Sequence, residues 1–461
     1  MKKSVLEKVK TIAAGVIVAP LIMGTMGICE AAELSIQEAV DMALEQNTDL
    51  AITRVGEKSA RADLKSARGQ NSVTVSGNGS LGLNKNSTES DQNRNGSVSA
   101  SVSLPIFTAG KNEANISSSK LGVKIAQLET ERERENTRLK VIKAYYDVLQ
   151  NKQTVEVDEQ TVNNYKAHLT NVQQLYEAGS KAKIDVLRSS VELSNSEQDL
   201  IRSKNKYEVS IKTLKNILGL PYEEELILTE DFNYVEFNPE LKDCLAYALE
   251  NRKDIIVDKY QVKQTKYAIR SAKADYYPQI SVSAGIGGSQ RYSPRPHTSS
   301  SDYEAGVSAR WNIFDGGVTH AAVEKARAAY EKAELTLLRD LENLDLSFQT
   351  AYLDMREAEK RLRTTKIAVT MAQEDYYIAT EKYKAGEGLM LDVLDAQVAL
   401  VSAQLNDISA KYDYSRSRAT VENEMGLSIG ETAEEALNRQ SDEITGQSAL
   451  DTKKEVEEDG Q

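Results

Sequence analysis

Two aspartates three residues apart, Asp392 and Asp395, are the side chains whose type and spacing could do chemistry. This spacing places both carboxylates on one face of a helix, where they repel each other. Their chemistry would be electrostatic, because clustered carboxylates attract cations and resist anions. The alternative is a solvated helix start, where the helix dipole favours acidic residues. The residues alone leave both interpretations open.

The other reactive side chains form no catalytic or metal-binding pattern. His168, His297 and His320 lie far apart and lack the spacing of metal ligands. No glycine-rich phosphate loop follows a predicted strand, and no nucleophile is paired with a base. The sequence therefore predicts a protein that is not an enzyme and that has no cofactor or metal.

The composition favours long helices over a compact globular core. The chain has 461 residues, of which 6% are aromatic and 28% are charged, and it contains only seven prolines. Few aromatics, few prolines and many charges suit thin helical packing. The net charge of −13 offers no basic patch, so we expect no nucleic-acid partner.

The N-terminal segment, 1–32, has the layout of a secretory signal peptide. Lysines precede an apolar stretch over residues 11–28, and Ala31 and Ala32 offer small residues for cleavage. A membrane anchor is the alternative interpretation. No later apolar run approaches this length, so we expect an exported product without a transmembrane helix.

Residues 104–220 recur 207 positions later without a gap. A constant offset over this distance indicates one structural unit used twice. The matched positions pair Ile106, Phe107, Gly110, Tyr176, Gly179 and Asp185 with Ile313, Phe314, Gly317, Tyr383, Gly386 and Asp392.

Four segments alternate apolar and small polar residues, which predicts strands with one polar and one apolar face. The strands are expected at 72–83, 97–106, 279–288 and 302–314, with polar loops at 84–96 and 287–301. They fit either a membrane barrel or soluble hairpins lying on helices. Four strands cannot close a barrel, and an open edge in lipid leaves backbone groups unpaired. A membrane barrel would therefore need strands from several copies.

Long helices follow each predicted strand pair. Proline is absent between Gly110 and Gly179, and this stretch reaches about 100 Å at the helical rise. Apolar residues recur every seven positions, the period of a coiled coil. This repeat includes Val141, Val148, Val155 and Val162, and on the returning helix Val186, Leu193, Leu200 and Tyr207.

These patterns divide the chain into a signal peptide, two repeats and a tail. The repeats cover residues 33–230 and 231–430. Their helical hairpins are expected at 110–218, with a tip near 179, and at 317–425, with a tip near 386. Residues 431–461 are acidic, and we expect them to be disordered beyond a possible short helix.

In this order of elements the chain resembles the TolC family of outer-membrane efflux and secretion ducts. The resemblance covers nearly all of the chain after the signal segment, and it rests on the doubled Ile-Phe-x-x-Gly junctions and Tyr-x-Ala-Gly turns. It implies a homotrimer whose twelve pooled strands form a β-barrel in outer-membrane lipid, with an α-barrel of helical hairpins in the periplasm. It also implies docking on a periplasmic adaptor and an inner-membrane pump, and export in a tripartite efflux or type I secretion system.

The resemblance further implies roles for the hairpin tips. Asp392 and Asp395 would ring the closed periplasmic entrance, and Asp185 with Tyr383 would help to hold it shut. Well-known relatives carry an arginine where this chain has Gly388, so a lock would use Lys384 or be weaker. The adaptor would dock on the two tips, which are otherwise simple turns: Ala178, Gly179, Ser180, Ala385, Gly386 and Glu387.

Two other classes of protein compete with a duct. A non-conducting coiled-coil spacer of the cell envelope would explain the heptads and the acidic charge. It would not explain four strands with faces of small hydroxyl residues. A periplasmic adaptor fits less well, since adaptors typically have one hairpin.

Overall fold

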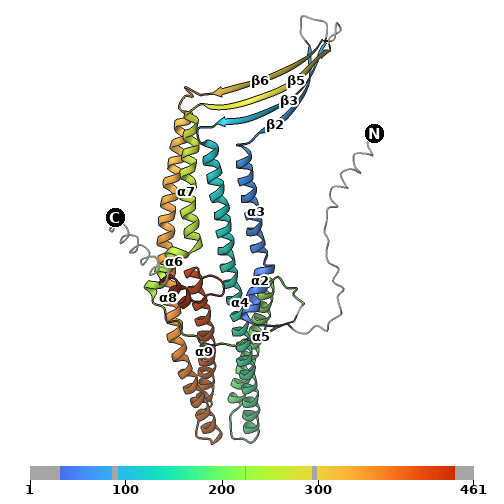
Figure 1. Cartoon of the computed structure of the whole chain (residues 1–461). Helices are drawn as coiled ribbons and strands as arrows, with labels where there is room; N and C mark the ends of the chain where they lie inside the picture. Colours follow the sequence, from blue (N-terminus) through green and yellow to red (C-terminus); the bar gives the residue numbers. More distant parts are fainter. Residues whose placement is uncertain (1–31, 86–91, 224, 293–297, 442–461) are drawn as a thin grey trace, which may run out of the picture.

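The computed structural model describes residues 32–85, 92–223, 225–292 and 298–441. The predicted signal segment lies outside these residues except for Ala32. Figure 1 shows an elongated molecule with a curved sheet at one end. At the other end lie the turns that connect each long helix to the helix returning beside it. Long helices connect the two ends.

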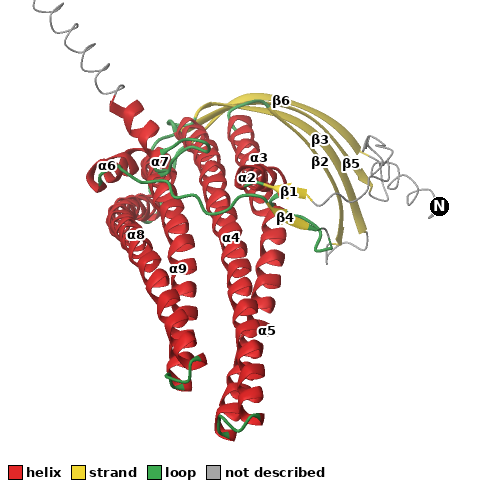
Figure 2. Ribbon diagram, turned by 90° about the horizontal axis from the view of Figure 1, so that it is seen from below, coloured by secondary structure: helices red, strands yellow, loops and turns green. Residues whose placement is uncertain are grey.

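Four helices form two antiparallel hairpins of equal size. α4 (Lys111–Glu177) and α8 (Val318–Lys384) each contain 67 residues, and α5 (Lys183–Leu218) and α9 (Met390–Met425) each contain 36. The longer helices each span about 100 Å, because each residue adds 1.5 Å. α4 folds back on α5, and α8 folds back on α9 (Figure 2).

Small residues occupy a regular row of buried positions along α5. The predicted heptad residues Val186, Leu193, Leu200 and Tyr207 are only half-buried, whereas Leu214, the next position of that heptad, is fully buried. A second heptad, three residues further on, is buried instead: Ser189, Ser196, Ser203 and Ser210. Each of these hydroxyls donates to a carbonyl in the preceding turn of its own helix, at 2.7–3.1 Å. Small side chains without free polar groups let the paired helix approach closely.

Shorter helices continue the lines of α5 and α9 toward the sheet. They are α2 (Ile36–Gln46), α3 (Thr48–Gly69), α6 (Leu241–Asn251), α7 (Lys253–Lys273) and the 3₁₀ helix η1 (Ala274–Tyr276). Ser35 and Glu38 form a capping box that begins α2. The Asn47 amide donates to the Ile217 carbonyl at 3.1 Å and so ties the end of α5 to the start of α3.

The long strands form one antiparallel sheet in the order β2-β3-β5-β6. Their bounds are Thr74–Lys85 (β2), Gln92–Phe107 (β3), Gln279–Tyr292 (β5) and Thr298–Arg310 (β6). β3 pairs with β5, which joins strands from the two halves of the chain. A separate two-stranded parallel sheet pairs β1 (Ala32–Leu34) with β4 (Leu226–Leu228).

The structure changes two expectations about the strands. The alternation predicts a last strand that reaches residue 314, but β6 ends at Arg310, because its partner Gln279 is the first residue of β5 and follows Pro278. The predicted loops at 84–96 and 287–301 are wrong in part, since their polar residues continue the strands. Asn95 pairs with Gly82, and Ser289 pairs with Ser300.

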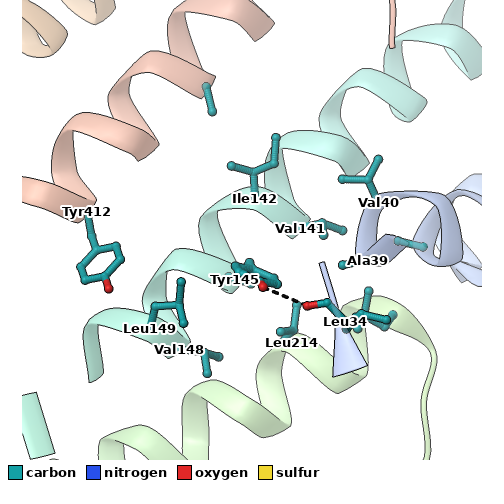
Figure 3. Packing of buried hydrophobic residues seen from close by; sticks show 14 of the residues in the cluster. Leu34, Ala39, Val40, Val141, Ile142, Tyr145, Val148, Leu149, Leu214 and Tyr412 are labelled. Atoms are coloured by element: carbon teal, nitrogen blue, oxygen red, sulfur yellow. Dashed lines mark hydrogen bonds between the residues drawn. The ribbon is translucent and has the colours of Figure 1, made fainter. Parts of the chain in front are cut away.

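The apolar core gathers where the short helices meet the hairpins. One cluster packs α2, α4, α5 and α9 around Tyr145, whose hydroxyl donates to the Leu34 carbonyl at 2.9 Å (Figure 3). A second cluster packs α6, α8 and α9 around Phe348 and Tyr414. The two hairpins are therefore anchored to each other at mid-height.

The tail begins with a short helix, which its sequence had left possible. Residues 433–441 are helical, and Ala433 and Ala436 are buried against the core around α6. Arg439 holds this helix through Glu431 at 2.8 Å and the Tyr247 hydroxyl at 3.2 Å. The rest of the predicted tail lies outside the described residues.

Candidate functional site

The register of the sheet collects polar side chains on one face. Serine Oγ atoms on neighbouring strands lie 2.8–2.9 Å apart in four cross-strand pairs: Ser76–Ser101, Ser80–Ser97, Ser281–Ser308 and Ser289–Ser300. Asp302 and Glu304 of β6 share this face by register, opposite Gly287 and Gly285. The face is therefore hydrophilic along its whole length.

The other face of the sheet is apolar and uncovered in a single chain. Leu81 is 93% exposed and Tyr303 is 83% exposed, and Val75, Val98 and Val307 are also exposed. β2 and β6 form the two edges of the sheet. Contiguous apolar surface of this kind marks contact with lipid or with another protein.

The two hairpin tips are built in the same way. Gly179 and Gly386 have φ values of 75° and 80°, in the left-handed region that glycine adopts without strain. The next N–H, of Ser180 or Glu387, reaches back to the carbonyl of Leu175 or Lys382 at 2.8–2.9 Å. This is the Schellman closure of a helix end. The predicted docking residues of both tips, 178–180 and 385–387, are all exposed.

An apolar cluster joins the two hairpins just above the tips. Val172 of the first hairpin packs with Tyr383, Met390 and Val393 of the second. Tyr383 is 2% exposed, and its hydroxyl has no hydrogen-bond partner among the described residues. Burial, reinforced by the Asp185 carboxylate, raises the pKa of Tyr383. Asp185 and Tyr383 are thus close, but no hydrogen bond joins them.

Two related positions of the hairpins both contact Tyr383. Lys181 of the first tip places its Nζ 4.3 Å from the centroid of the Tyr383 ring. The equivalent position of the second tip, at the offset of the repeat, is Gly388. A Cβ atom there would lie 2.9 Å from the Tyr383 backbone nitrogen. This turn therefore has no room for the arginine that the family resemblance led us to expect there.

Lys384 and the two aspartates make local contacts within their own elements. Lys384 pairs with Glu381 of the same helix at 2.8 Å, so it does not bridge the hairpins of one chain. Asp392 accepts a hydrogen bond from the Leu389 N–H at 3.2 Å and caps α9. Asp392 and Asp395 are both exposed, whereas Val393 and Ala396 are buried. Both carboxylates therefore project away from the contact between the hairpins.

Sequence reasoning missed a groove between the first hairpin and α9. It has a volume of about 380 Å³ and is lined by Asp158, Glu192 and Asp199 on one side and Val398 and Leu405 on the other. Burial, with a smaller effect of the Asp199 charge, raises the pKa of Asp158. Only the packing of separate helices brings these residues together, so no local motif could reveal them.

Comparison with known proteins decides the family. The sequence model described as outer membrane efflux protein matches residues 39–220 and residues 245–427. The chain belongs to the outer membrane efflux protein family. Membership assigns it to the outer membrane and confirms the TolC-like resemblance.

Curated relatives of this efflux family share part of the chain. The alkaline protease secretion protein AprF of Pseudomonas aeruginosa is 23% identical over 301 residues, and the outer membrane protein TolC of Vibrio cholerae is 22% identical over 288 residues. The matches cover 64% and 60% of this chain. They cover 62% and 64% of the relatives, which is less than two thirds of their length.

Solved structures of efflux channels share the fold. The CmeC outer membrane channel of Campylobacter jejuni has a TM-score of 0.76 at 18% identity, over 88% of this chain and 89% of that one. VceC of Vibrio cholerae has a TM-score of 0.73 at 17% identity, over 86% and 96%. The expected fold of long helices with a four-stranded sheet is confirmed.

Among the described residues, no helix combines the length and the hydropathy needed to cross a membrane.

Proposed function

We propose that three copies of this chain assemble into one duct that exports substrates through the outer membrane. The observation that carries the proposal is the sheet, with its serine-rich face, its exposed apolar face and its two free edges. In lipid, unpaired edge groups are prohibitively costly. Pairing β6 of each copy with β2 of the next would close a barrel of about twelve strands. The serine-rich face would line a water-filled interior, and the apolar face would contact lipid.

Exposed apolar residues on the helices support assembly between copies. On α5, Ile184, Leu187 and Ile201 are exposed. On α8, Leu346 is 68% exposed and Leu353, one heptad later, is 62% exposed. A single chain leaves both stripes in water, whereas a ring of hairpins buries them between neighbours.

A duplication supports the division into two repeats. α8 and α9 have the lengths of α4 and α5, and the same constant offset separates the two members of each pair. The family model also matches two segments of nearly equal length. We infer that the repeats at 33–230 and 231–430 arose from one ancestral hairpin-and-strand unit.

The tips form the periplasmic end of the proposed duct. Exposed backbone at Gly179 and Gly386 would receive a periplasmic adaptor, which couples the duct to an inner-membrane pump. Relatives are named for secretion of alkaline protease and export of pyoverdine, which supports both type I secretion and efflux as settings.

The same end would hold the constriction. Asp392 and Asp395 project from the hairpin contact, and three copies would supply six carboxylates around one axis. A ring of this charge draws cations and resists anions. The buried Tyr383 and the nearby Asp185 would hold the tips shut, and Lys384 would act between copies only by exchanging its partner Glu381. Partner docking would bias this two-state gate.

The alternative is a non-conducting coiled-coil spacer. Semi-native electrophoresis and planar-bilayer recording separate the two functions. A duct gives trimers that fall apart on heating and that conduct ions. A rod that never conducts in bilayers would overturn the proposal.

A further inference from the structure

His168 lies at the contact between the two hairpin tips. It belongs to α4, and its ring centroid is 5.7 Å from that of Tyr383 on α8. Its Nε2 is 2.9 Å from Met390 Sδ at the start of α9. One imidazole therefore contacts both helices of the second hairpin, within the cluster that joins the hairpins.

These contacts suit a neutral imidazole. A protonated histidine has two N–H donors and needs an acceptor for each, but a thioether sulfur is a weak acceptor. Tyr383 and Met390, the two residues that His168 contacts, belong to an apolar cluster with Val172 and Val393. Burial lowers the pKa of His168. A charge at this position would lose water without gaining a strong partner.

The charged and titratable groups nearby do not offer that partner. From the first tip, the Lys181 ammonium already covers the Tyr383 ring, so a second cation would face it. The Asp185 carboxylate of α5 lies near Tyr383, where its charge raises the pKa of the tyrosine. The other groups are engaged: Lys166 pairs with Glu197, Lys384 pairs with Glu381, and Asp392 caps α9. Burial raises the pKa of Tyr165 to about 12, so its hydroxyl stays neutral.

We propose that His168 is a proton-operated latch between the hairpin tips, which holds them together when neutral and releases them when protonated. The proposal rests on the proposed duct only for its consequence, which is opening of the periplasmic entrance in acid. The latch itself is a property of the contact between α4, α8 and α9.

The direction of the effect follows from linkage. In the closed form, burial keeps the pKa of His168 below the ordinary histidine value of about 6.5. Protons therefore bind His168 more tightly in the open form, where the imidazole is hydrated. Closure is fully favoured above about pH 6.5 and is lost progressively as the pH falls below it.

Thiol labelling of the full-length protein tests the latch. Val393→Cys places a thiol in the buried cluster, and Leu391→Cys places one on the exposed side of the same helix, both in a background with Cys29→Ser and Cys244→Ser, which removes the two native thiols. The ratio of the two maleimide labelling rates cancels the pH dependence of thiol reactivity. We expect this ratio to rise at least about threefold between about pH 7.5 and pH 5.5, and to stay constant with His168→Gln. A flat ratio, or an equal rise in the glutamine variant, would overturn the latch.

Two further readouts separate possible failures. If the cysteine variants do not fold, the NMR titration of ¹³C-labelled histidine replaces them, and a His168 pKa at or above about 6.5 contradicts the proposal. Planar-bilayer recording of the His168 protein and of His168→Gln tests the consequence. Absence of channels at both pH values overturns the duct, whereas channels with the same pH response in both proteins overturn the latch.

Discussion

Gly388 approaches Tyr383 so closely that a Cβ atom on the glycine would lie 2.9 Å from the tyrosine backbone nitrogen. The close approach comes from the turn itself, in which the Gly388 N–H donates to the Lys382 carbonyl at 3.0 Å. The turn therefore requires glycine at this position, where the family resemblance led us to expect an arginine. The same tyrosine lies under Lys181, so the second tip is shaped by contacts from both hairpins.

Gly388→Ala should loosen the second tip. Overpacking at such contacts costs about 1–3 kcal/mol. Trypsin cleavage after Lys382 and Lys384 should accelerate about fivefold or more, since local opening exposes these sites. Gly56→Ala is the matched control, because a Cβ at this helical glycine meets no atom within 4 Å. Equal cleavage of both variants would contradict the steric argument.

Ser203→Leu should destabilise the first hairpin. The serine is buried in the small-residue heptad of α5, and a leucine would force α4 and α5 apart. We expect a loss of about 1–3 kcal/mol in the free energy of unfolding, measured by denaturation followed by circular dichroism. Ser203→Ala keeps the side chain small, so it should cost clearly less than the leucine, even though it removes the hydroxyl that donates within α5 and interacts with the Asp158 carboxylate of α4. A leucine variant as stable as the alanine variant would show that the helices do not pack closely there.

Asp258→Asn should stabilise the α7–α8 contact at neutral pH. Burial, together with Asp340 and Asp254, raises the pKa of Asp258 to about 6. Above pH 6 the folded protein must hold this carboxylate charged, so stability falls as the pH rises from about 4 through 6. The asparagine variant should melt about 1–2 °C higher at about pH 7.5 and match the wild type near about pH 4.5. The exposed Asp63→Asn should show no such difference between the two pH values. A pH-independent gain would rule out titration of Asp258 as its cause.

Asparagine at both 392 and 395 should weaken cation selectivity. The substitution removes six charges from the proposed trimeric constriction while keeping the size of the side chains. Reversal potentials in a planar bilayer with a salt gradient should show the cation-to-anion permeability ratio falling at least about twofold. Asp41→Asn, at an exposed position on α2, is the control. An unchanged ratio in the double variant would contradict the proposed role in selectivity and leave Asp392 with its capping role alone.

Much of the architecture could be predicted from local patterns. Glycine at 179 and 386, with no proline before it, places the ends of α4 and α8 within two residues. Alternation of serine with valine predicts where the strands lie, because successive residues of a strand point to opposite faces of the sheet. The end of β6 could not be predicted in this way, since it depends on where its partner β5 begins.

Contacts between distant segments explain what was missed. The helix at residues 433–441 is held by the core around α6, and its acidic composition conceals the buried Ala433 and Ala436. The position of His168 between the hairpins is likewise invisible in the sequence, since its partners Tyr383 and Met390 belong to the other half of the chain. The roles of Asp392 and Asp395 depend on an axis that one chain does not contain.

The mass of the detergent-solubilised protein, measured by light scattering with the detergent contribution subtracted, tests the shared barrel most directly. The account predicts three chains per particle, because only then do the free edges of β2 and β6 find partners. A stable particle containing a single chain of about 51 kDa would contradict it.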